Sequence, residues 1–282
     1  MTVREALRQG TDRLGHDGAE TPYLDTTLLL AHCMGTSKEH LFAELLTELP
    51  ASVLSNFHSA LDKRRQGTPV SYIRRRKEFY GREFYVDERV LVPRPDTETV
   101  VETALGVLDE MSGEPAARVL DCGTGSGCIA ITLAAERPRL EVAASDISRG
   151  AEEVFRLNAQ RILGRVPAFY RSNLLQSVPG SFHLIVSNPP YLRTAEVRAM
   201  QRERNWPEPA ESLDGGADGL ELVRPLVFQA LHSLQSNGYL VLEVADDQNG
   251  RVCKLMEEAG YTEVGARTDL AGRRRVVVGR RG

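Results

Sequence analysis

Four consecutive residues of this chain, Asn188-Pro189-Pro190-Tyr191, have the types and spacing to hold a planar NH2 group. They follow the apolar run Leu184-Ile185-Val186, which predicts a short buried strand. Both prolines lack an N–H and have a fixed φ, and Asn188 before a proline is pushed into an extended conformation, so a rigid corner is expected. The Asn188 side chain and the Pro189 carbonyl would offer two acceptor oxygens to the two N–H bonds of one amino group. That arrangement would present its nitrogen to an electrophile.

Two interpretations of this corner stay open at this point. It is either a proline turn that closes a strand, or a site that holds an amino nitrogen. Open α/β sheets bind their ligands beyond the carboxyl ends of their strands, where the corner is expected. Asn-Pro-Pro-Tyr after an apolar strand also resembles the motif of methyltransferases that modify amide or exocyclic amino nitrogens.

A glycine-rich turn marks a second candidate site. The apolar pair Val119-Leu120 leads into Asp121-Cys122 and the turn, and an apolar helix is expected from Cys128 to Ala135. Glycines let the backbone approach a ligand and present N–H groups at a helix start. Dinucleotide enzymes also have such turns, but here the spacing is Gly-x-Gly-x-Gly, and no Gly-Lys-Ser/Thr phosphate loop is present. The residues expected to contact a cofactor are Gly123, Thr124, Gly125, Ser126 and Gly127.

Further strand ends carry polar residues. A second strand, predicted over Glu141–Ser145, ends at Asp146, where an acid can accept hydrogen bonds from ribose hydroxyls. The alternative for Asp146 is a helix cap. A third strand near 168–170 ends close to Asn173-Leu174, and a fourth, 183–187, delivers the Asn-Pro-Pro-Tyr corner.

Length and composition place the chain among globular proteins. Its 282 residues are enough for two domains, and 41% are hydrophobic and 26% charged. No apolar run approaches the roughly 18–20 residues of a membrane span, and residues 1–10 lack the apolar core of a signal peptide. The formal net charge of −4 disfavours extensive non-specific binding to naked nucleic acid. These features favour a cytoplasmic protein that is not in a membrane.

The cysteines and histidines lack the spacing of a metal site. Cys33, Cys122, Cys128 and Cys253 form no CxxC pair and lie within apolar patterns. Buried, reduced thiols are therefore favoured over a disulfide or a metal site. The six histidines are scattered, and we expect no metal.

The patterns divide the chain into three segments. Residues 1–67 have helical spacing and predict a small helical domain, in which one helix starts at Thr21-Pro22 and stops near Gly35. Thr36 with Glu39 predicts a capping box for the next helix. Residues 68–95 suggest a hairpin linker. Residues 96–282 form the third segment, and from Arg118 on strands alternate with helices, which indicates a parallel sheet covered on both faces.

With these residues in place, residues 96–282 resemble a class I S-adenosylmethionine-dependent methyltransferase. The whole chain resembles the release-factor glutamine methyltransferases of the HemK/PrmC type. Beyond the corner and the glycine turn, the segments that carry the resemblance are 22–32, 67–73, Glu78-Phe79-Tyr80-Gly81, 92–98, Glu208-Pro209, 213–220, Leu242-Glu243-Val244 with Gln248, and 269–272. Three residues depart from the family pattern: Arg75 stands at a usual glycine, Asn173 at a frequent acid, and Asn249 at a common glycine.

The resemblance implies a fold, a cofactor and an activity. The fold would be a Rossmann-like class I methyltransferase sheet with a small N-terminal helical domain that recognises the substrate. The activity would be N5-methylation of the glutamine side chain in the Gly-Gly-Gln loop of peptide chain release factors, with S-adenosylmethionine as cofactor. Asn188 and Pro189 would be catalytic, and Pro190 and Tyr191 would complete the substrate slot. In the cofactor site, which also includes Asn188, residues 123–127 would line the methionine end, Asp146 would bind the ribose, and Asn173 with Leu174 would flank the adenine.

Other functions stay open from the residues alone. The main alternative is an adenine-N6 methyltransferase acting on DNA or RNA, because the same corner suits that NH2 group. Such an enzyme must extract a base and hold a phosphate backbone, yet the chain has no large target-recognition insertion and no strong positive charge. A non-catalytic cofactor-binding protein is a further alternative. We expect a monomer whose partners are release factors, with no direct contact to nucleic acid and none to a membrane.

Overall fold

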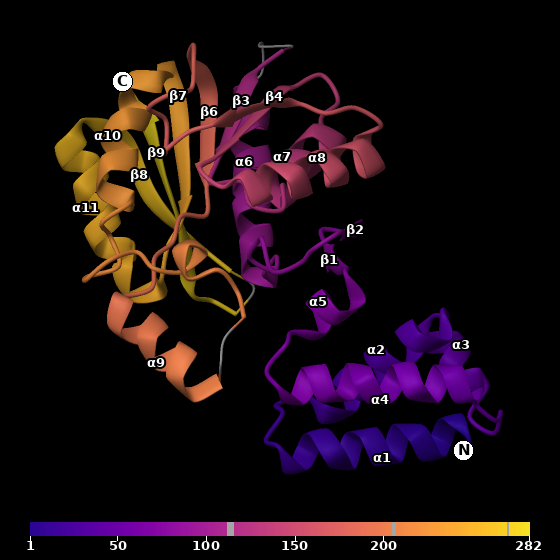
Figure 1. The fold of residues 1–282 in the computed structure, drawn as a ribbon. Coiled ribbons are helices and arrows are strands. Elements are labelled where there is room, and N and C mark those ends of the chain that lie inside the picture. Colours follow the sequence, from indigo (N-terminus) through magenta and orange to yellow (C-terminus); the bar gives the residue numbers. More distant parts are fainter. Residues whose placement is uncertain (112–115, 205–206, 270) are drawn as a thin grey trace. The chain divides into compact units, whose positions relative to one another are not determined.

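The computed structural model describes residues 1–111, 116–204, 207–269 and 271–282. The chain divides into two compact units (Figure 1): Met1–Arg76 with Met200–Pro207, and Lys77–Ala199 with Glu208–Gly282. Within the described ranges, no helix combines the length and the apolar character needed to cross a membrane.

The smaller unit is a set of helices around one apolar core. Its helices are α1 (Val3–His16), α2 (Pro22–Met34), α3 (Lys38–Ala43), α4 (Ala51–Arg65) and α5 (Val70–Arg74). The predicted start of α2 and its stop at Gly35, which is left-handed with φ +66°, are confirmed. The predicted capping box is wrong: Ser37 caps α3 by accepting from the His40 N–H. Thr36 belongs to the end of α2, because its N–H donates to the Ala31 carbonyl at 3.0 Å.

Arg75 shows why a glycine is usual at its position. It follows α5 with φ +55°, in the left-handed region where a Cβ is unfavourable and a glycine has no steric cost. Its N–H donates to the Tyr72 carbonyl at 3.2 Å and closes the helix. The departure therefore places a strained residue at this cap, and the hairpin itself still forms from β1 (Lys77–Phe79) and β2 (Arg82–Phe84).

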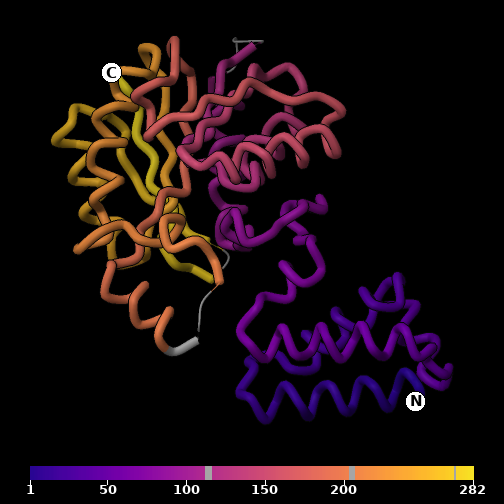
Figure 2. The backbone as a smooth tube through the Cα atoms, viewed as in Figure 1, coloured from indigo at the N-terminus to yellow at the C-terminus, as the bar shows by residue number. Residues whose placement is uncertain are grey.

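The larger unit is a seven-stranded sheet with helices on both faces. The strand order is β5-β4-β3-β6-β7-β9-β8. The strands are β3 (Arg118–Cys122), β4 (Glu141–Asp146), β5 (Ala168–Arg171), β6 (Phe182–Ser187), β7 (Leu234–Glu243), β8 (Tyr261–Thr268) and β9 (Arg274–Arg281). The parallel sheet predicted from the alternation is confirmed from β5 to β7. The antiparallel β9, which lies between β7 and β8 at the yellow end of the chain (Figure 2), was not predicted.

Residues alternate along the strands between two apolar cores. One face of the sheet packs against α6 (Glu98–Glu110), α7 (Cys128–Glu136) and α8 (Arg149–Leu163), and the other against α10 (Val223–Ser233) and α11 (Asn249–Ala259) (Figure 1). Val119 of β3 lies in the first core and Leu120 in the second, as period-two side chains require. The remaining elements are the helix α9 (Thr194–Arg204) and the short turns η1 (Pro95–Thr97), η2 (Ala210–Ser212) and η3 (Asp246–Gln248). Buried on both faces, the central strands hold their carboxyl ends in fixed register.

Candidate active site

The carboxyl ends of four parallel strands meet at one edge of the sheet. Cys122 at the end of β3 pairs with Ser145 on one side and with Ser187 on the other, and Ser187 pairs with Leu242 of β7. The next residues along these strands begin the glycine turn and supply Asp146, Asn188 and Glu243. The structure therefore brings the predicted corner and the predicted cofactor residues to the same edge.

The Asn188 side chain is held by one hydrogen bond with a defined direction. Its Nδ2 donates to Thr97 Oγ1 at 3.2 Å, and Thr97 is buried at the end of η1. Pro189 is buried, while Asn188 is only half-buried. Because Nδ2 is engaged on the inner side, Oδ1 is left as the acceptor that Asn188 offers to a ligand.

A buried carboxyl group lies behind the corner. Glu243 is fully buried at the end of β7 and its Oε1 accepts from the Tyr191 hydroxyl at 3.1 Å. Burial raises the pKa of Glu243 to about 7, against the opposing hydrogen bond from the Tyr191 hydroxyl and the charge of Arg275. Glu243 Oε2 is buried and has no hydrogen-bond partner among the described residues. Burial and the Glu243 charge also raise the pKa of Tyr191 above its usual range, so its phenol stays protonated.

Two glycines allow a second segment to pack directly against the corner. A Cβ on Gly215 would come within 2.6 Å of the Pro190 carbonyl oxygen, and one on Gly219 within 2.4 Å of the Tyr191 carbonyl oxygen. The Gly215 N–H donates to the Leu192 carbonyl at 2.8 Å. Segment 213–220, which the sequence analysis named only for its resemblance to the family, therefore packs directly against the backbone of the corner.

Further support comes from Gln248 and Glu208. Gln248 Nε2 donates to the Tyr191 carbonyl at 2.8 Å. Glu208 is buried and accepts from the Val92 N–H at 2.9 Å and from Arg94. The bonds of Glu208 to Val92 and Arg94 fix the loop that leads to η1 and Thr97. Segments far apart in the sequence thus converge on the Asn-Pro-Pro-Tyr corner.

The glycine turn offers open space rather than free donors. The N–H groups of Gly123 and Thr124 donate to the Ser145 carbonyl, and that of Gly125 donates to Asp146 Oδ2 at 2.9 Å. The expectation that these glycines present N–H groups to a ligand is wrong for these positions, because β4 already uses the donors. Gly123 and Gly125 have φ of +73° and +53°, and a Cβ on either would meet nothing within 4 Å.

The third glycine has a different task. A Cβ on Gly127 would come within 2.7 Å of Ile131 and of Phe155. This glycine lets α7 pack closely on α8, whereas the first two leave room for a ligand. A phosphate group needs free N–H donors, so the turn fits a cofactor without phosphate better than a dinucleotide.

Asp121 places a buried carboxyl group beneath the turn. Its Oδ2 accepts from Thr124 Oγ1 at 2.6 Å and from the Ala130 N–H at 3.1 Å. Its Oδ1 is buried and has no hydrogen-bond partner among the residues that the structure describes. Burial raises its pKa to about 7, although these two donors oppose the shift. The unused oxygen suits a cationic group such as an ammonium.

Asp146 both orders the turn and remains available to a ligand. Its Oδ2 accepts from Gly125, and its Oδ1 accepts from the Ser148 N–H at 2.9 Å, just before α8. Burial raises its pKa, opposed by the N–H groups of Ser148 and Gly125. Each carboxylate oxygen can accept a second hydrogen bond, so the cap and the ribose roles are compatible.

Ile147 was not predicted as a site residue. It follows Asp146 directly and 66% of its surface is exposed, which is unusual for a large apolar side chain at a strand end. Such a side chain can cover one face of a base. An isoleucine directly after the strand-end acid was the signal in the sequence.

Asn173 and Leu174 lie in the loop after β5. Asn173 is exposed and its carbonyl accepts from the Gln176 N–H at 3.2 Å. Leu174 has φ +51° and packs against the core on the α10 face. The Ser172 N–H donates to the Asp146 carbonyl at 3.0 Å, so the loop starts beside the predicted ribose acid. Thr97 and Glu243, in contrast, were not predicted as site residues, because only the fold brings Thr97 to Asn188 and Glu243 to Tyr191.

The edge as a whole fits a methyl donor that carries an amino acid end and a nucleoside end. The turn has open space and a nearby carboxyl group in Asp121, Asp146 has carboxylate oxygens that can each accept a further hydrogen bond, and Ile147 has an exposed apolar side chain. Asn188 Oδ1 and the Pro189 carbonyl are the acceptors expected to hold an NH2 group, and they follow the adjoining strand β6. This arrangement can hold an amino nitrogen next to a cofactor.

Comparisons with known proteins relate the chain to methyltransferases. Residues 5–74 match the PrmC N-terminal domain, and residues 102–214 match the methyltransferase small domain. A release factor glutamine methyltransferase of Coxiella burnetii is 34% identical over 283 residues, covering 100% of both chains. One of Koribacter versatilis is 37% identical over 283 residues, covering 100% of this chain and 99% of that one. A solved methyltransferase of Pyrococcus furiosus, 19% identical, superposes with a TM-score of 0.53 over 72% of this chain and 90% of its own, which supports the fold.

Proposed function

Since this chain belongs to the release factor glutamine methyltransferase family, we propose that it methylates a glutamine side chain of peptide chain release factors. The methylated atom is N5 of the glutamine in their Gly-Gly-Gln loop, and S-adenosylmethionine is the methyl donor. The observation that carries the proposal is the hydrogen bond of Asn188 Nδ2 to Thr97, which leaves Oδ1 of this half-buried side chain as the acceptor for a ligand.

The corner acts by holding the substrate amide. Asn188 Oδ1 and the Pro189 carbonyl accept the two N–H bonds of the glutamine NH2 group and fix the plane of the amide. Bound S-adenosylmethionine supplies a methyl group on a positively charged sulfur. Positioning of this kind is worth about 7–11 kcal/mol of barrier in favourable cases. Pro190 and Tyr191 shape the slot and limit the access of water.

Electrostatics assists the same step. An amide nitrogen is a poor nucleophile, because its lone pair is delocalised into the carbonyl group. Two acceptor oxygens stabilise the positive charge that develops on this nitrogen as its bond to carbon forms. The surplus proton passes from the nitrogen to solvent water after attack, since neither Asn188 nor Pro189 is a base.

Different residues contact different parts of the methyl donor S-adenosylmethionine. Residues 123–127 line its methionine end, Asp146 binds its ribose, and Asn173 with Leu174 flanks its adenine. Asn188 borders both the cofactor and the substrate. The support for this assignment is the open space at Gly123 and Gly125 and the free acceptor capacity of Asp146.

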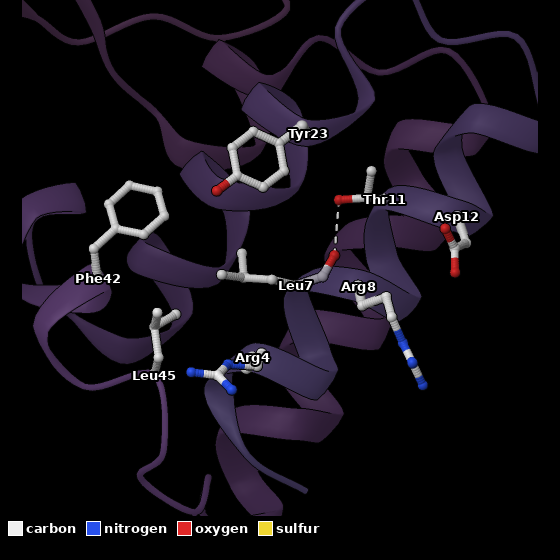
Figure 3. Close-up of a pocket in the computed structure, with 8 residues that line it drawn as sticks. All are labelled: Arg4, Leu7, Arg8, Thr11, Asp12, Tyr23, Phe42 and Leu45. Atoms are coloured by element: carbon white, nitrogen blue, oxygen red, sulfur yellow. Dashed lines mark hydrogen bonds between the residues drawn. The ribbon is translucent and has the colours of Figure 1, made fainter.

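We also propose that residues 1–67 form a substrate-recognition domain, joined by the linker 68–95 to the methyltransferase domain 96–282. The helical unit has a groove of about 360 Å³ on its surface (Figure 3). The Tyr23 and Phe42 rings stack in it at 6.4 Å and are 55% and 40% exposed. The groove is lined by Arg4, Leu7, Arg8, Thr11, Asp12, Tyr23, Phe42 and Leu45. Exposed rings beside arginines are typical of protein-binding surfaces.

The groove can be tested in the intact chain. Tyr23→Ala and Phe42→Ala should each raise KM for intact release factor roughly fivefold or more, the effect of an ordinary interface anchor. They should leave kcat unchanged. Leu46→Ala is the matched control, because Leu46 is 73% exposed and does not line the groove. Equal KM values for all three variants and the wild type would contradict this role.

The proposed substrate also sets the proposed surroundings. We propose that the enzyme works in the cytoplasm as a monomer, without direct contact to nucleic acid. Size-exclusion chromatography with light scattering tests the monomer.

Transfer of a radioactive methyl group tests the function. The purified enzyme is incubated with labelled S-adenosylmethionine and with release factor, an adenine-containing oligonucleotide, or no substrate. Label in release factor alone is the expected result, and it should disappear when the loop glutamine is replaced by glutamate. Label in the oligonucleotide would instead support adenine-N6 methylation, and no label in any arm would overturn methyl transfer.

A further inference from the structure

We propose that Tyr191 is held at both of its ends by the last residue of β7 and by the turn η3, with Glu243 and Gln248 as positioning residues. This inference rests on the proposed function, in which Tyr191 shapes the slot for the glutamine side chain. It assigns a task to two residues that do not themselves touch the reacting atoms. Both are buried, since Glu243 is 0% exposed and Gln248 is 2% exposed.

The phenol end of Tyr191 is held by the carboxyl group of Glu243. The Tyr191 hydroxyl donates to Glu243 Oε1 at 3.1 Å. Burial and the charge of Glu243 raise the pKa of Tyr191 above its usual range, so the hydroxyl keeps its proton and remains the donor. The other staggered positions about the Cα–Cβ bond would carry the hydroxyl away from Glu243. One hydrogen bond at the tip of the side chain therefore fixes where the ring lies.

The backbone end of Tyr191 is held by the side-chain amide of Gln248. Gln248 Nε2 donates to the Tyr191 carbonyl at 2.8 Å, and Gln248 Oε1 accepts from the Ala245 N–H at 3.2 Å. A backbone N–H can only donate and a carbonyl can only accept, so the two bonds determine which way the Gln248 amide faces. Gly219 leaves room for this contact, because a Cβ there would come within 2.4 Å of both Gln248 Nε2 and the Tyr191 carbonyl oxygen.

Stability alone does not account for a carboxyl group at position 243. Glu243 Oε2 is buried and has no hydrogen-bond partner among the residues that the structure describes. A buried polar atom without a partner destabilises a fold, and apolar side chains of similar size in place of buried charged groups are often neutral or stabilising. The bond that Glu243 accepts from Tyr191 gives a reason for the carboxyl group at the end of β7.

The two contacts act on a residue directly beside the acceptors of the corner. Tyr191 follows Pro189 by two residues, and the φ of the intervening Pro190 is fixed. A ring in a fixed position limits the ways in which the glutamine side chain can lie in the slot. Misplacement of a reacting group by about 1 Å can lower turnover about 100-fold. Loss of either contact should therefore lower kcat and leave cofactor affinity nearly unchanged.

A double-mutant cycle with the full chain and intact release factor tests the contact between Tyr191 and Glu243. Tyr191→Phe removes only the hydroxyl, Glu243→Leu removes the carboxyl group, and the double variant removes both partners. Glu243→Gln keeps an acceptor oxygen for the hydroxyl. Tyr261→Phe is the matched control, because the Tyr261 hydroxyl also donates to one acceptor, the Val227 carbonyl, at 2.9 Å. Tyr261 pairs with Arg281, at the end of β9 that lies away from Glu243.

Tyr191→Phe and Glu243→Leu should each lower kcat by about 10- to 100-fold. The double variant should be no slower than the slower single variant, because both changes remove the same contact. Its Tm should be at least that of Tyr191→Phe, in which the buried Glu243 has lost its partner. Glu243→Gln should lose far less kcat than Glu243→Leu, and Tyr261→Phe should keep the wild-type kcat. In all of these variants the cofactor Kd and the KM for release factor should change by less than about twofold.

Gln248→Glu tests the other end of Tyr191. An ionised glutamate keeps an acceptor for the Ala245 N–H but places an oxygen against the Tyr191 carbonyl oxygen, so the contact becomes repulsive. This variant should lower kcat by about 10- to 100-fold with little change in cofactor Kd. Gln229→Glu is the matched control, because Gln229 Oε1 likewise accepts from a backbone N–H, that of Leu175 at 3.0 Å, and Gln229 lies in α10.

The proposal is overturned if Tyr191→Phe, folded as judged by Tm and cofactor binding, keeps wild-type kcat, or if the losses of the two single variants multiply in the double variant. A folded Gln248→Glu with wild-type kcat would overturn it at the backbone end. If Glu243→Leu does not fold, the comparison of Tyr191→Phe with Glu243→Gln decides, since Glu243→Gln must then be the faster enzyme. A wild type that transfers no methyl group to release factor would instead refute the proposed function, so the two failures are distinguishable.

Discussion

The corner at Asn188 and the glycine turn at 123–127 lie at the same sheet edge but are built in opposite ways. The corner is held by residues from distant parts of the chain: Thr97, Gly215, Gly219, Glu243 and Gln248. The turn is held by local bonds between 121 and 148, and it leaves open space at two of its glycines. A substrate amide must be held in one geometry, whereas a cofactor must enter and leave.

The comparison also shows what each region does with its buried carboxyl group. Glu243 accepts from the Tyr191 hydroxyl of the corner through Oε1, and its Oε2 has no hydrogen-bond partner among the described residues. Asp121 uses one oxygen for the turn and leaves the other without a partner among the described residues. We therefore expect changes at the corner to lower turnover, and changes at the turn to lower cofactor affinity.

The largest loss of turnover is expected when Gly219, which packs against the backbone of the corner, is replaced by a larger residue. Gly219→Ala would place a Cβ 2.4 Å from the Tyr191 carbonyl oxygen, so the corner must move. A displacement of about 1 Å can lower turnover about 100-fold. The control is Gly164→Ala, which has a similar φ of +68° but nothing within 4 Å of its Cβ. Steady-state kinetics on release factor should show the loss for Gly219→Ala alone, and equal losses would mean that φ strain rather than the contact matters.

At the turn, Asp146→Ala should weaken cofactor binding by roughly 1.5–3 kcal/mol, the range for hydrogen bonds to a charged group. Asp146→Asn, which keeps one acceptor, should lose less. Calorimetry of S-adenosylmethionine binding measures both. Unchanged affinity would mean that Asp146 only orders the turn and the start of α8.

A smaller effect is expected at Asn173. An acid there would accept a stronger hydrogen bond from the adenine amino group, so Asn173→Asp should tighten cofactor binding by less than about tenfold. Asn173→Leu should weaken it. Gln176→Glu, an exposed neighbour in the same loop, controls for added charge. If Asn173→Asp and Asn173→Leu both bind as the wild type does, Asn173 does not touch the adenine.

The smallest effect concerns stability. The pKa of Asp121 is about 7 in the folded protein and 3.8 in the absence of burial, so the folded state binds more protons between these values. Stability should therefore fall as the pH rises from about 4 to 7. Asp121→Asn should gain Tm relative to the wild type at pH 8 and gain less at pH 5, at about 2–4 °C per kcal/mol. Differential scanning calorimetry with the same Tm difference at both pH values would contradict this.

The sequence predicted the residues expected to contact ligands better than the residues that hold those side chains in place. The corner follows from two prolines and an apolar strand, and Asp146 follows from a strand end, because both signals are local. The family and the Rossmann-like fold with its helical N-terminal region are confirmed. Thr97, 91 residues from Asn188 in the sequence, contacts it from η1, and Glu243, 52 residues from Tyr191, contacts Tyr191 from the end of β7. No local pattern could show these contacts. The antiparallel β9 was missed for the same reason, since an apolar run such as Val276–Val278 does not encode its direction.

The most direct test of the account is Asn188→Ala, with turnover on release factor and cofactor affinity measured on the same protein. Removing the outward-facing acceptor should lower kcat by about 100- to 1,000-fold, as for other preorganised hydrogen-bonding groups. The Kd for S-adenosylmethionine should stay within about twofold of the wild type, since the turn and Asp146 remain intact. Near-wild-type turnover would contradict the role of Asn188 in holding the glutamine amide, and an equal loss of cofactor affinity would contradict the division of tasks between the corner and the turn.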